Sequence, residues 1–474
     1  MRAFLSIVKL TFRHAVRSHI FQLLFLVLLL CVALIPTTIT NTNAADFLKS
    51  SIFYSLWIVS AVLGLSSIWL GCFIMTGDID SYQLHMVVSK PVSRITVWLG
   101  KWMGVCLVNL LLLVLASTAV YFIILYRFEN LEFQPGEKER MRAEVLVGRR
   151  AFPADRPDYA EAIQHLVRQK IRRLTSQGRT VDTQMQEKLI KDSQLEVVSR
   201  DSEAKHNTIK SWRFSNIPDP NGKPIFLRYR PYINKVASED QRPTHLLWSV
   251  GIPRERKAAP QAGPVSQSNA KTYDIYLYPL DDKPDQVMTG IFHEKELRPE
   301  WNVVSSDGKV FMTVHNLDRF AGTLYFQPAD GPRMLVPATT FAGNYARAVL
   351  VTGLELMLLA ALSCAFAGCL SMPVAIFMVM SYLLFGAFSV YMVNLEYISG
   401  MADRFGQLVG KILLWVVIPL QRFDVSSLVS DGVLVEWALV GELFFHLIVL
   451  KALPLVLLGI YFYNKRELGL IVRK

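Results

Sequence analysis

The chain carries, between Gly77 and Lys101, the polar stretch GDIDSYQLHMVVSKPVSRITVWLGK. Long apolar runs stand directly before and after it, at Ile52–Thr76 and Trp102–Tyr126. A helix of ~20 apolar residues crosses a bilayer core, so both runs are long enough to span a membrane. The stretch is therefore predicted to be a loop tethered at a membrane surface, where another protein can contact it.

Further apolar runs along the chain define its class. The sequence is 52% hydrophobic and 19% charged, a modest departure from soluble proteins, but the apolar residues are concentrated in long blocks. No such block lies between Arg127 and Tyr345. The sequence thus predicts an α-helical polytopic membrane protein with one large polar insert. We expect six transmembrane helices, at about 20–38, 52–76, 102–126, 346–370, 372–394 and 437–463.

Basic residues near the ends of the spans predict the orientation, because short cytoplasmic loops carry an excess of Lys and Arg. The N-terminal segment and the C-terminus are both basic, and the 77–101 loop carries Lys90, Arg94 and Lys101. Both termini and this loop are therefore expected on the cytoplasmic side of a bacterial inner membrane. The sequence pI of about 9.3 does not indicate a nucleic-acid partner, because the basic residues are dispersed.

Three regions follow from this topology. Residues 1–126 hold a cytoplasmic amphipathic helix and the first three spans, and residues 346–474 hold the last three. The extracytoplasmic insert, 127–345, is predicted to be an α+β domain. Its first part, 127–210, shows apolar residues at helical spacing, and its second part, 211–345, shows short β-type runs separated by turn signals, which favours a β-sandwich. The candidate strands are Ile225–Tyr229, Leu246–Val250, Tyr273–Leu277, Val287–Phe292, Val310–Val314, Thr323–Phe326 and Arg333–Val336.

One further segment, 406–432, holds an apolar run that Pro419 interrupts. The run is too short and too broken to span comfortably. Irregular backbone at membrane depth is tolerated only where protein covers it or where it lines a water-filled cavity. We therefore expect an outer re-entrant hairpin in this segment, before the last span.

Ionisable residues inside spans are costly and therefore mark candidate sites. Glu355 lies in the fourth span, and Glu442 and His446 lie four residues apart in the sixth. One interpretation is that the three line a translocation cavity; the other is that Glu442 and His446 pair with each other near the outer surface. The fourth span also carries Ala360, Cys364 and Gly368 at four-residue spacing, which fits close helix packing either within one protomer or at a dimer seam.

No catalytic, cofactor-binding or metal-binding residues are expected. A P-loop requires GxxxxGK[ST], and the nearest string, GQLVGKI at residues 406–412, is one residue short and lacks the hydroxyl. The five cysteines lie in or beside spans, without zinc-ligand spacing. The chain is therefore not expected to be an enzyme, and ATP-driven work by it requires a separate ATPase subunit.

Four features in order resemble the permease subunits of type-2 ABC transporters, the exporter-like class. A basic amphipathic segment, IVKLTFRHAVRSHIF at 7–21, leads into the first span. SKPVSRITVWLGK at 89–101 opens the third span, a broken hairpin precedes the last one, and YFYNKRELGL at 461–470 follows it. The resemblance covers about 1–126 and 346–474. The insert departs from the family, whose ordinary members have a short loop at that place.

The resemblance implies a mechanism and partners. Such permeases work as pairs, so this chain is expected to form a homodimer or to pair with a similar subunit, in contact with membrane lipid and two cytoplasmic ABC ATPase subunits. ATP binding then moves the permease helices and drives export or translocation of a substrate that the sequence does not identify. The ATPase-coupling loop implied here carries Asp78, Asp80, Lys90, Pro91, Arg94 and Lys101.

Two alternatives remain open at this point. In a mechanotransmission complex, ATPase motion would operate the periplasmic module on a periplasmic partner without transport. In the other alternative, the chain is a membrane-anchored protein that binds glycan or peptidoglycan and needs no ATPase. A cavity between the membrane helices would favour transport, and a tightly packed dimer seam without a cavity would favour mechanotransmission.

The predicted topology has a direct test at residues 258–270, AAPQAGPVSQSNA, which the sequence predicts to be a flexible loop of the insert. A protease added outside intact spheroplasts should cut there, as seen by immunoblotting against tags at the two termini. Cleavage only after the membrane is permeabilised would place the insert in the cytoplasm.

Overall fold

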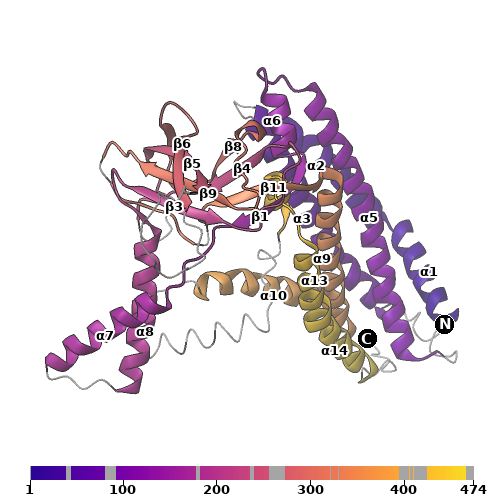
Figure 1. Ribbon diagram of the computed structural model, residues 1–474. Coiled ribbons are helices and arrows are strands. Elements are labelled where there is room, and N and C mark those ends of the chain that lie inside the picture. Colours follow the sequence, from indigo (N-terminus) through magenta and orange to yellow (C-terminus); the bar gives the residue numbers. More distant parts are fainter. Residues whose placement is uncertain are drawn as a thin grey trace, which may run out of the picture. The chain divides into compact units, whose positions relative to one another are not determined.

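A computed structural model of the protein describes residues 2–38, 44–80, 92–177, 182–234, 240–255, 273–320, 322–328, 330–393, 405, 409 and 424–465. The chain divides into two compact units. The first unit comprises Met1–Gly148 and Thr339–Lys474, and the second comprises Arg149–Ala338. The first is helical and the second contains the sheets (Figure 1). The second unit is shorter at both ends than the predicted insert, because the flanking residues belong to the helical unit.

The helical unit contains the long apolar segments of the sequence. Its described helices are α1 (Arg2–Arg17), α2 (His19–Thr38), α3 (Ala44–Asp80), α5 (Arg94–Asn130), α6 (Glu137–Glu144), α9 (Phe341–Cys369), α10 (Met372–Val393), α12 (Ser426–Ser430), α13 (Trp437–Phe444), the π-helical η3 (Phe445–Ala452) and α14 (Leu453–Lys465). Four of these segments are long and apolar enough to cross a membrane: Ala44–Gly77, Arg94–Asn130, Phe341–Cys369 and Trp437–Lys465. The protein is therefore a membrane protein by the length and composition of these helices.

Two of the six expected spans look different in the structure. The first, α2, joins α1 at a bend of 63°, so the two form one broken helix pair. The fifth, α10, runs crosswise to α9 in Figure 1 and has a shorter apolar stretch, Met372–Phe388. Length and composition thus support four spans among the described residues, or five if the α1–α2 pair counts as one.

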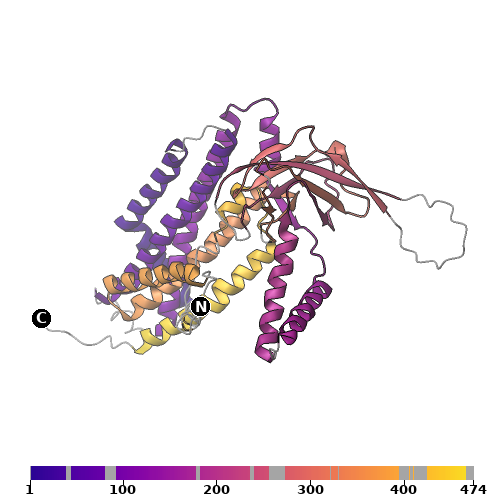
Figure 2. The ribbon, with the colours of Figure 1, turned by 90° about the vertical axis from the view of Figure 1, so that its left-hand side faces the viewer.

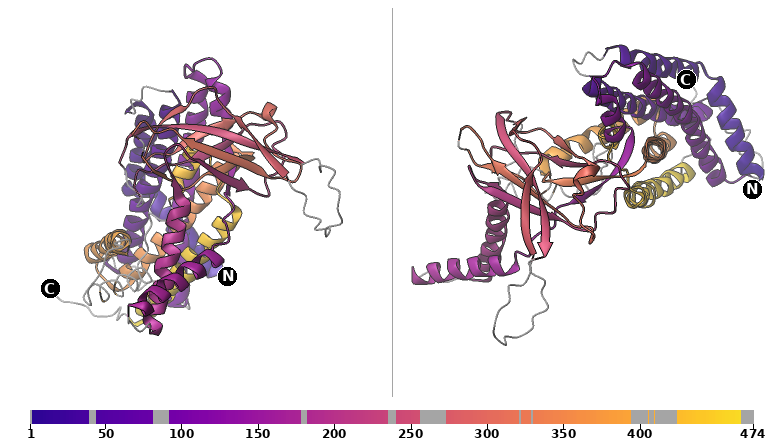
Figure 3. Two further views of the ribbon diagram at one scale, coloured as in Figure 1. Left: turned by 60° about the vertical axis from the view of Figure 1, so that its left-hand side comes forward. Right: turned by 45° about the horizontal axis from the view of Figure 1, so that its top comes forward.

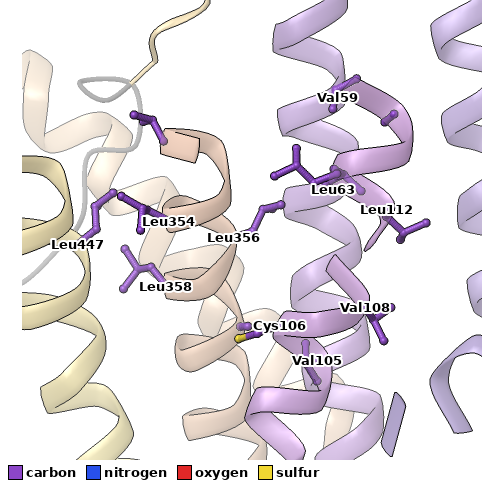
Figure 4. Packing of buried hydrophobic residues seen from close by; sticks show 14 of the residues in the cluster. Val59, Leu63, Val105, Cys106, Val108, Leu112, Leu354, Leu356, Leu358 and Leu447 are labelled. Atoms are coloured by element: carbon purple, nitrogen blue, oxygen red, sulfur yellow. The ribbon is translucent and has the colours of Figure 1, made fainter. Parts of the chain in front are cut away.

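The main core of the helical unit is an apolar cluster built largely from α3, α5, α9 and the last span, and a second, small cluster joins Ile68, Leu362 and Val379. Figure 4 shows Val59 and Leu63 of α3 near Leu112 of α5, and Leu354 and Leu358 of α9 directed toward Leu447. Within the most apolar 18-residue stretch of each helix, 61% of α9 is buried, against 28% of Trp437–Lys465. α9 is therefore the central helix, and the last span exposes most of its surface.

Small and polar side chains join α3 to α9 and α5. Ser67 Oγ donates to the carbonyl of Leu356 at 3.1 Å and accepts from Asn109 Nδ2 at 2.9 Å. Ser363 Oγ donates to the carbonyl of Ser67 at 3.4 Å. Small residues let helices approach closely enough for such bonds in a membrane. The predicted ridge of α9 is buried within this one chain and consists of Ala360, Ala361, Cys364, Ala365 and Gly368. Cys364 faces Gly71 of α3, whereas Gly368 lies next to Gly459 of α14.

The predicted 77–101 loop is shorter in the structure because helices extend into it from both sides. α3 continues to Asp80, and α5 begins at Arg94. The Ser93 side chain accepts a hydrogen bond from the backbone N–H of Thr96, which is a standard helix N-cap. Residues 81–91 lie outside the described residues.

The sheet unit has three sheets. A four-stranded sheet has the order β1-β11-β4-β8, a five-stranded sheet has β3-β9-β5-β6 with β7 also on β5, and β10 pairs with β2. Alternate residues of β4, β5 and β9 enter one apolar cluster, which includes Leu227, Trp248 and Met312. The strands are β1 (Val147–Pro153), β2 (Glu203–Ala204), β3 (Ile209–Phe214), β4 (Ile225–Tyr229), β5 (Pro243–Glu255), β6 (Tyr273–Pro279), β7 (Asp285–Met288), β8 (His293–Leu297), β9 (Val310–Asn316), β10 (Leu324–Tyr325) and β11 (Arg333–Thr340).

The seven candidate strands all coincide with or overlap a strand, whereas β1, β2, β3 and β8 were not predicted. β8 has the sequence HEKEL, which lacks an apolar pattern. It forms an edge of its sheet through antiparallel pairing with β4. Arg149 of β1, which is fully buried, holds Glu294 with two bonds of 2.8 and 3.3 Å. This buried ion pair explains why a charged segment forms a strand.

The part of the insert that was expected to be helical, 127–210, contains α6, α7 (Ala160–Ser176) and α8 (Thr183–Ser202), but also β1, β2 and the start of β3. α7 and α8 extend away from the strands in Figures 2 and 3. Asp182 caps α8 by accepting from the N–H of Met185, and Lys170 of α7 binds Glu196 of α8 at 2.8 Å. Residues 256–272, which include the predicted 258–270 loop, lie outside the described residues.

A close helix approach gives a stability test at Gly459 of α14. A Cβ atom there would lie 2.6 Å from Trp98 Cζ2 and 3.0 Å from the Ala365 Cα. Gly459→Ala should therefore lower the thermal unfolding temperature in detergent, by overpacking that costs about 1–3 kcal/mol. The matched control is Gly441→Ala, because a Cβ there meets nothing within 4 Å. Equal unfolding temperatures for the two variants would contradict this packing.

Candidate functional site

A cavity of about 420 Å³ lies among α3, α9, α10 and the start of α12. Volumes of this size are typical of small-molecule sites. Its polar lining residues are Ser60, Thr352, Glu355, Asp424 and Ser426. The remaining lining is apolar or small and consists of Trp57, Ala61, Gly64, Leu65, Ile68, Leu356, Leu359, Met380, Leu383 and Val425.

Glu355 lies halfway along the 29-residue α9. Ser60 of α3 faces it, with its Oγ 3.4 Å from Glu355 Oε2. Thr352 lies three residues before Glu355 and lines the same cavity, because residues i and i+3 share a helix face. The α3–α9 seam fixes the separation of the two helices at this depth, and the cavity forms where α10 and α12 complete the wall.

The segment 424–436 brings a second carboxylate to this cavity. Asp424 accepts a hydrogen bond from the N–H of Ser426 at 2.9 Å and lines the cavity with Glu355. Farther along, Asn344 donates to the carbonyl of Val433 at 2.9 Å and accepts from the N–H of Val435 at 2.8 Å. The segment therefore runs beside α9 from the helix middle to its first turn.

The same segment packs against the backbone of Glu144, whose side chain forms buried ion pairs. Gly432 has a positive φ of 65°, and a Cβ atom there would lie 2.0 Å from the Glu144 carbonyl oxygen. Glycine is required by both the backbone conformation and the close approach. The Glu144 side chain is 3% exposed and binds Lys49 at 2.5 Å and Arg140 at 3.4 Å. α3, α6 and the 424–436 segment are thus joined at one point.

The structure separates the three predicted cavity residues. Glu355 lines the cavity, whereas Glu442 of α13 and His446 of η3 are exposed and are not among the residues that line it. No ion pair joins Glu442 to His446 among the described interactions. Sequence reasoning missed Asp424 and Ser60 as lining residues. The available signal for Asp424 was its position four residues after Leu420, where the broken apolar run ends.

The predicted coupling residues lie at helix ends where they are described. Arg94 Nη1 donates to the carbonyl of Asn464 in α14 at 2.9 Å. Lys101 is 3% exposed, and its Nζ donates to the carbonyl of Ile74 in α3 at 3.0 Å. Asp78 and Asp80 belong to the last turns of α3. Lys90 and Pro91 lie outside the described residues.

The amphipathic helix α1 packs along the same end of α5. Its buried residues are Val8, Thr11 and Ala15, at the spacing of one helix face. α5 presents Gly100 and Gly104 to this face, next to Ile7 and Thr11. The start of α5 therefore contacts α1, the end of α3 and the end of α14.

The sheet unit carries a smaller hollow of about 70 Å³ with aromatic walls. Trp212, Phe326 and Tyr159 line it. Tyr159 donates to Asp201 Oδ2 at 2.6 Å, and burial together with this bond raises the pKa of Tyr159 to about 12. Burial lowers the pKa of Lys210, although its ion pair with Asp201 opposes that shift. The hollow offers aromatic faces beside hydrogen-bonding groups.

Comparison with known proteins adds no assignment to this geometry. No family model, curated protein or solved structure matches the chain. Within the described residues, no group of three or more His, Cys, Asp or Glu side chains is placed to hold a metal ion. Of these two hollows among the described residues, the cavity beside Glu355 is the larger and carries two carboxylates.

Asn344 provides a test of how the cavity wall is held. The side chain is fully buried, and Asn344→Leu would leave a half-buried carbonyl and a buried N–H of the 424–436 segment unpaired. Each unpaired group costs about 1–3 kcal/mol. The variant should unfold at a clearly lower temperature in detergent. Asn130→Leu, at an exposed position, is the control, and an equal shift in both variants would rule out this anchoring role.

Proposed function

We propose that the chain is the permease subunit of an ATP-driven ABC transporter that exports or translocates a substrate. A partner ATPase supplies the ATP hydrolysis, and a second permease, either another copy or a similar subunit, completes the complex in a bacterial inner membrane. The observation that carries the proposal is the cavity beside Glu355, because a carboxylate in the middle of an apolar span is costly unless a pathway or site uses it.

The full architecture belongs to the same proposal. Six spans with cytoplasmic termini, an outer re-entrant hairpin at 406–432 and an extracytoplasmic β-sandwich fit the chain. Two observations support the membrane part. Four helices are long and apolar, and residues 424–436 run beside α9 from its middle to its first turn. The apolar cluster shared by β4, β5 and β9 supports the sandwich. Within the hairpin, residues 409 and 424–432 are described.

Contacts at the start of α5 suggest how motion of the ATPase would reach the membrane helices. A coupling loop that moves with the ATPase would carry Arg94, whose side chain binds the end of α14, and Lys101, whose side chain binds the end of α3. The α3–α9 seam then links that motion to the cavity wall. Transport follows if the ATPase-bound states differ in their contacts with this loop, since only differential contact shifts a conformational equilibrium.

Two other functions compete with transport. Mechanotransmission to the sheet unit requires no cavity and would be favoured by a tightly packed dimer seam, whereas the small residues of α9 are buried within one chain. Binding of glycan or peptidoglycan is favoured by the aromatic hollow at Trp212 and Tyr159, because aromatic faces beside polar groups suit sugar rings. Neither accounts for the two carboxylates in the membrane cavity, which is why transport is placed first.

The test is co-purification of this protein with a cytoplasmic ABC ATPase subunit from its native cells. Reversing the charge of the loop with Lys90→Glu and Arg94→Glu should weaken co-purification by about tenfold or more, because charge-assisted contacts turn into repulsion. Lys90→Glu alone separates this effect from loss of the Arg94–Asn464 bond.

The matched control is Arg168→Glu with Arg172→Glu, two exposed positions on α7. It should co-purify with the ATPase as the unaltered protein does, and membrane insertion should be unchanged in all variants. Normal association of the Lys90 and Arg94 variants would remove the coupling-loop assignment. Absence of any associated ATPase would exclude both transport and mechanotransmission, and would leave the glycan-binding function.

A further inference from the structure

The charged side chains that line the cavity beside Glu355 are all acidic. Glu355 and Asp424 contribute two carboxylates, and no Lys, Arg or His is among the described residues that line it. Among the described residues, the hydrogen bond that Glu355 receives is a long one of 3.4 Å from Ser60. A carboxylate in an apolar membrane helix is stabilised by a positive charge close to it, and the described walls do not supply one.

The rest of the lining is apolar and has one large aromatic ring. Leu65, Leu356 and Met380 are among the apolar lining residues, and Trp57 lies in the same wall as Ser60. An indole ring attracts cations through its negative face. The cavity therefore combines two carboxylates, an aromatic ring and apolar walls, in a volume suited to a small molecule.

We propose that this cavity binds an organic cation with an apolar body. The inference rests on the proposed transport function and names the substrate class for it. The cationic group lies between Glu355 and Asp424, the hydroxyls of Ser60 and Ser426 accept any N–H bonds it offers, and the apolar body packs against α9 and α10.

Other ligand classes fit the lining less well. A sugar would leave most of its hydroxyls facing leucine and methionine side chains, and unpaired buried polar groups are costly. A bare metal ion would need more oxygen ligands than this largely apolar wall offers. Trp57 is 49% exposed and Leu65 is 56% exposed, so the cavity opens on the outer surface of the helical unit. A ligand that partitions between water and lipid can enter there.

The test measures binding to the full-length protein in lipid nanodiscs without an ATPase. The probe is tetraphenylphosphonium, and its neutral counterpart is triphenylphosphine oxide, which has similar aryl groups and no net charge. Saturable binding of the cation is expected, with little binding of the neutral compound. Glu355→Gln should weaken cation binding by about tenfold or more, because it removes a direct charge pair while keeping the side-chain shape.

Two further variants control the result. Asp424→Asn alters the second carboxylate outside the long spans and should also weaken binding, which keeps the test valid if Glu355→Gln does not fold. Glu442→Gln alters a carboxylate of the last span that does not line the cavity, and its affinity should stay within about twofold of the unaltered protein.

The outcomes separate this inference from the proposed function. Absence of saturable cation binding overturns the inference, and so does equal binding of the neutral compound or equal affinity in the Glu355, Asp424 and Glu442 variants. If the ATPase still co-purifies in that case, the transporter proposal stands with another substrate class. Cation binding without any associated ATPase would keep the site and remove the ATP-driven function.

Discussion

The close packing of α9 against α3 is the contact on which the helical unit depends. In a bilayer, lipid tails are as apolar as leucine, so burial of apolar surface does not drive helices together. Small residues and hydrogen bonds must do so, and Ser67, Asn109 and Ser363 provide them at the helix middle. Once α9 is held there, Glu355 is fixed beside Ser60, and the last span has a surface at Leu354 and Leu358 on which to pack.

The same packing explains how the cavity coexists with a tight core. α3 and α9 meet closely at Ser67 and Ser363, while near Ser60 and Glu355 the walls are completed by α10 and α12. Asn344 and Gly432 hold the segment that carries Asp424, and they do so through backbone bonds and a buried Glu144. The α3–α9 seam is rigid, whereas the 424–436 segment is held at a few points, which include Asn344 and Gly432. In such an arrangement, motion of a helix end can change the shape of the cavity. The contacts of Arg94 and Lys101 place the ends of α14 and α3 at the start of α5.

The sheet unit follows different physics, because its strands alternate between residues that enter an apolar core and residues that face away from it. Alternation of apolar and polar residues predicted β4, β5 and β9, each of which contributes alternate residues to one core. It did not predict β8, because the residues of HEKEL are held by pairing with β4 and by the Arg149–Glu294 bond rather than by their own pattern. Such a bond joins residues 145 positions apart in the chain, and no local pattern encodes it.

The sequence by itself determined the membrane character of the chain, the position of its long apolar helices and the polar insert between them, because hydrophobic length is a local property. It also identified Glu355 as an ionisable residue inside a span. Only the tertiary structure decided that Glu355 meets Asp424 and Ser60, that Glu442 and His446 lie elsewhere, and that the small residues of α9 pack within one chain. These are contacts between residues far apart in sequence, and helix packing sets them. The 77–101 stretch illustrates both contributions. Its polarity could be read from the sequence, but the extension of α3 and α5 into it depends on helix caps and on contacts with neighbouring helices.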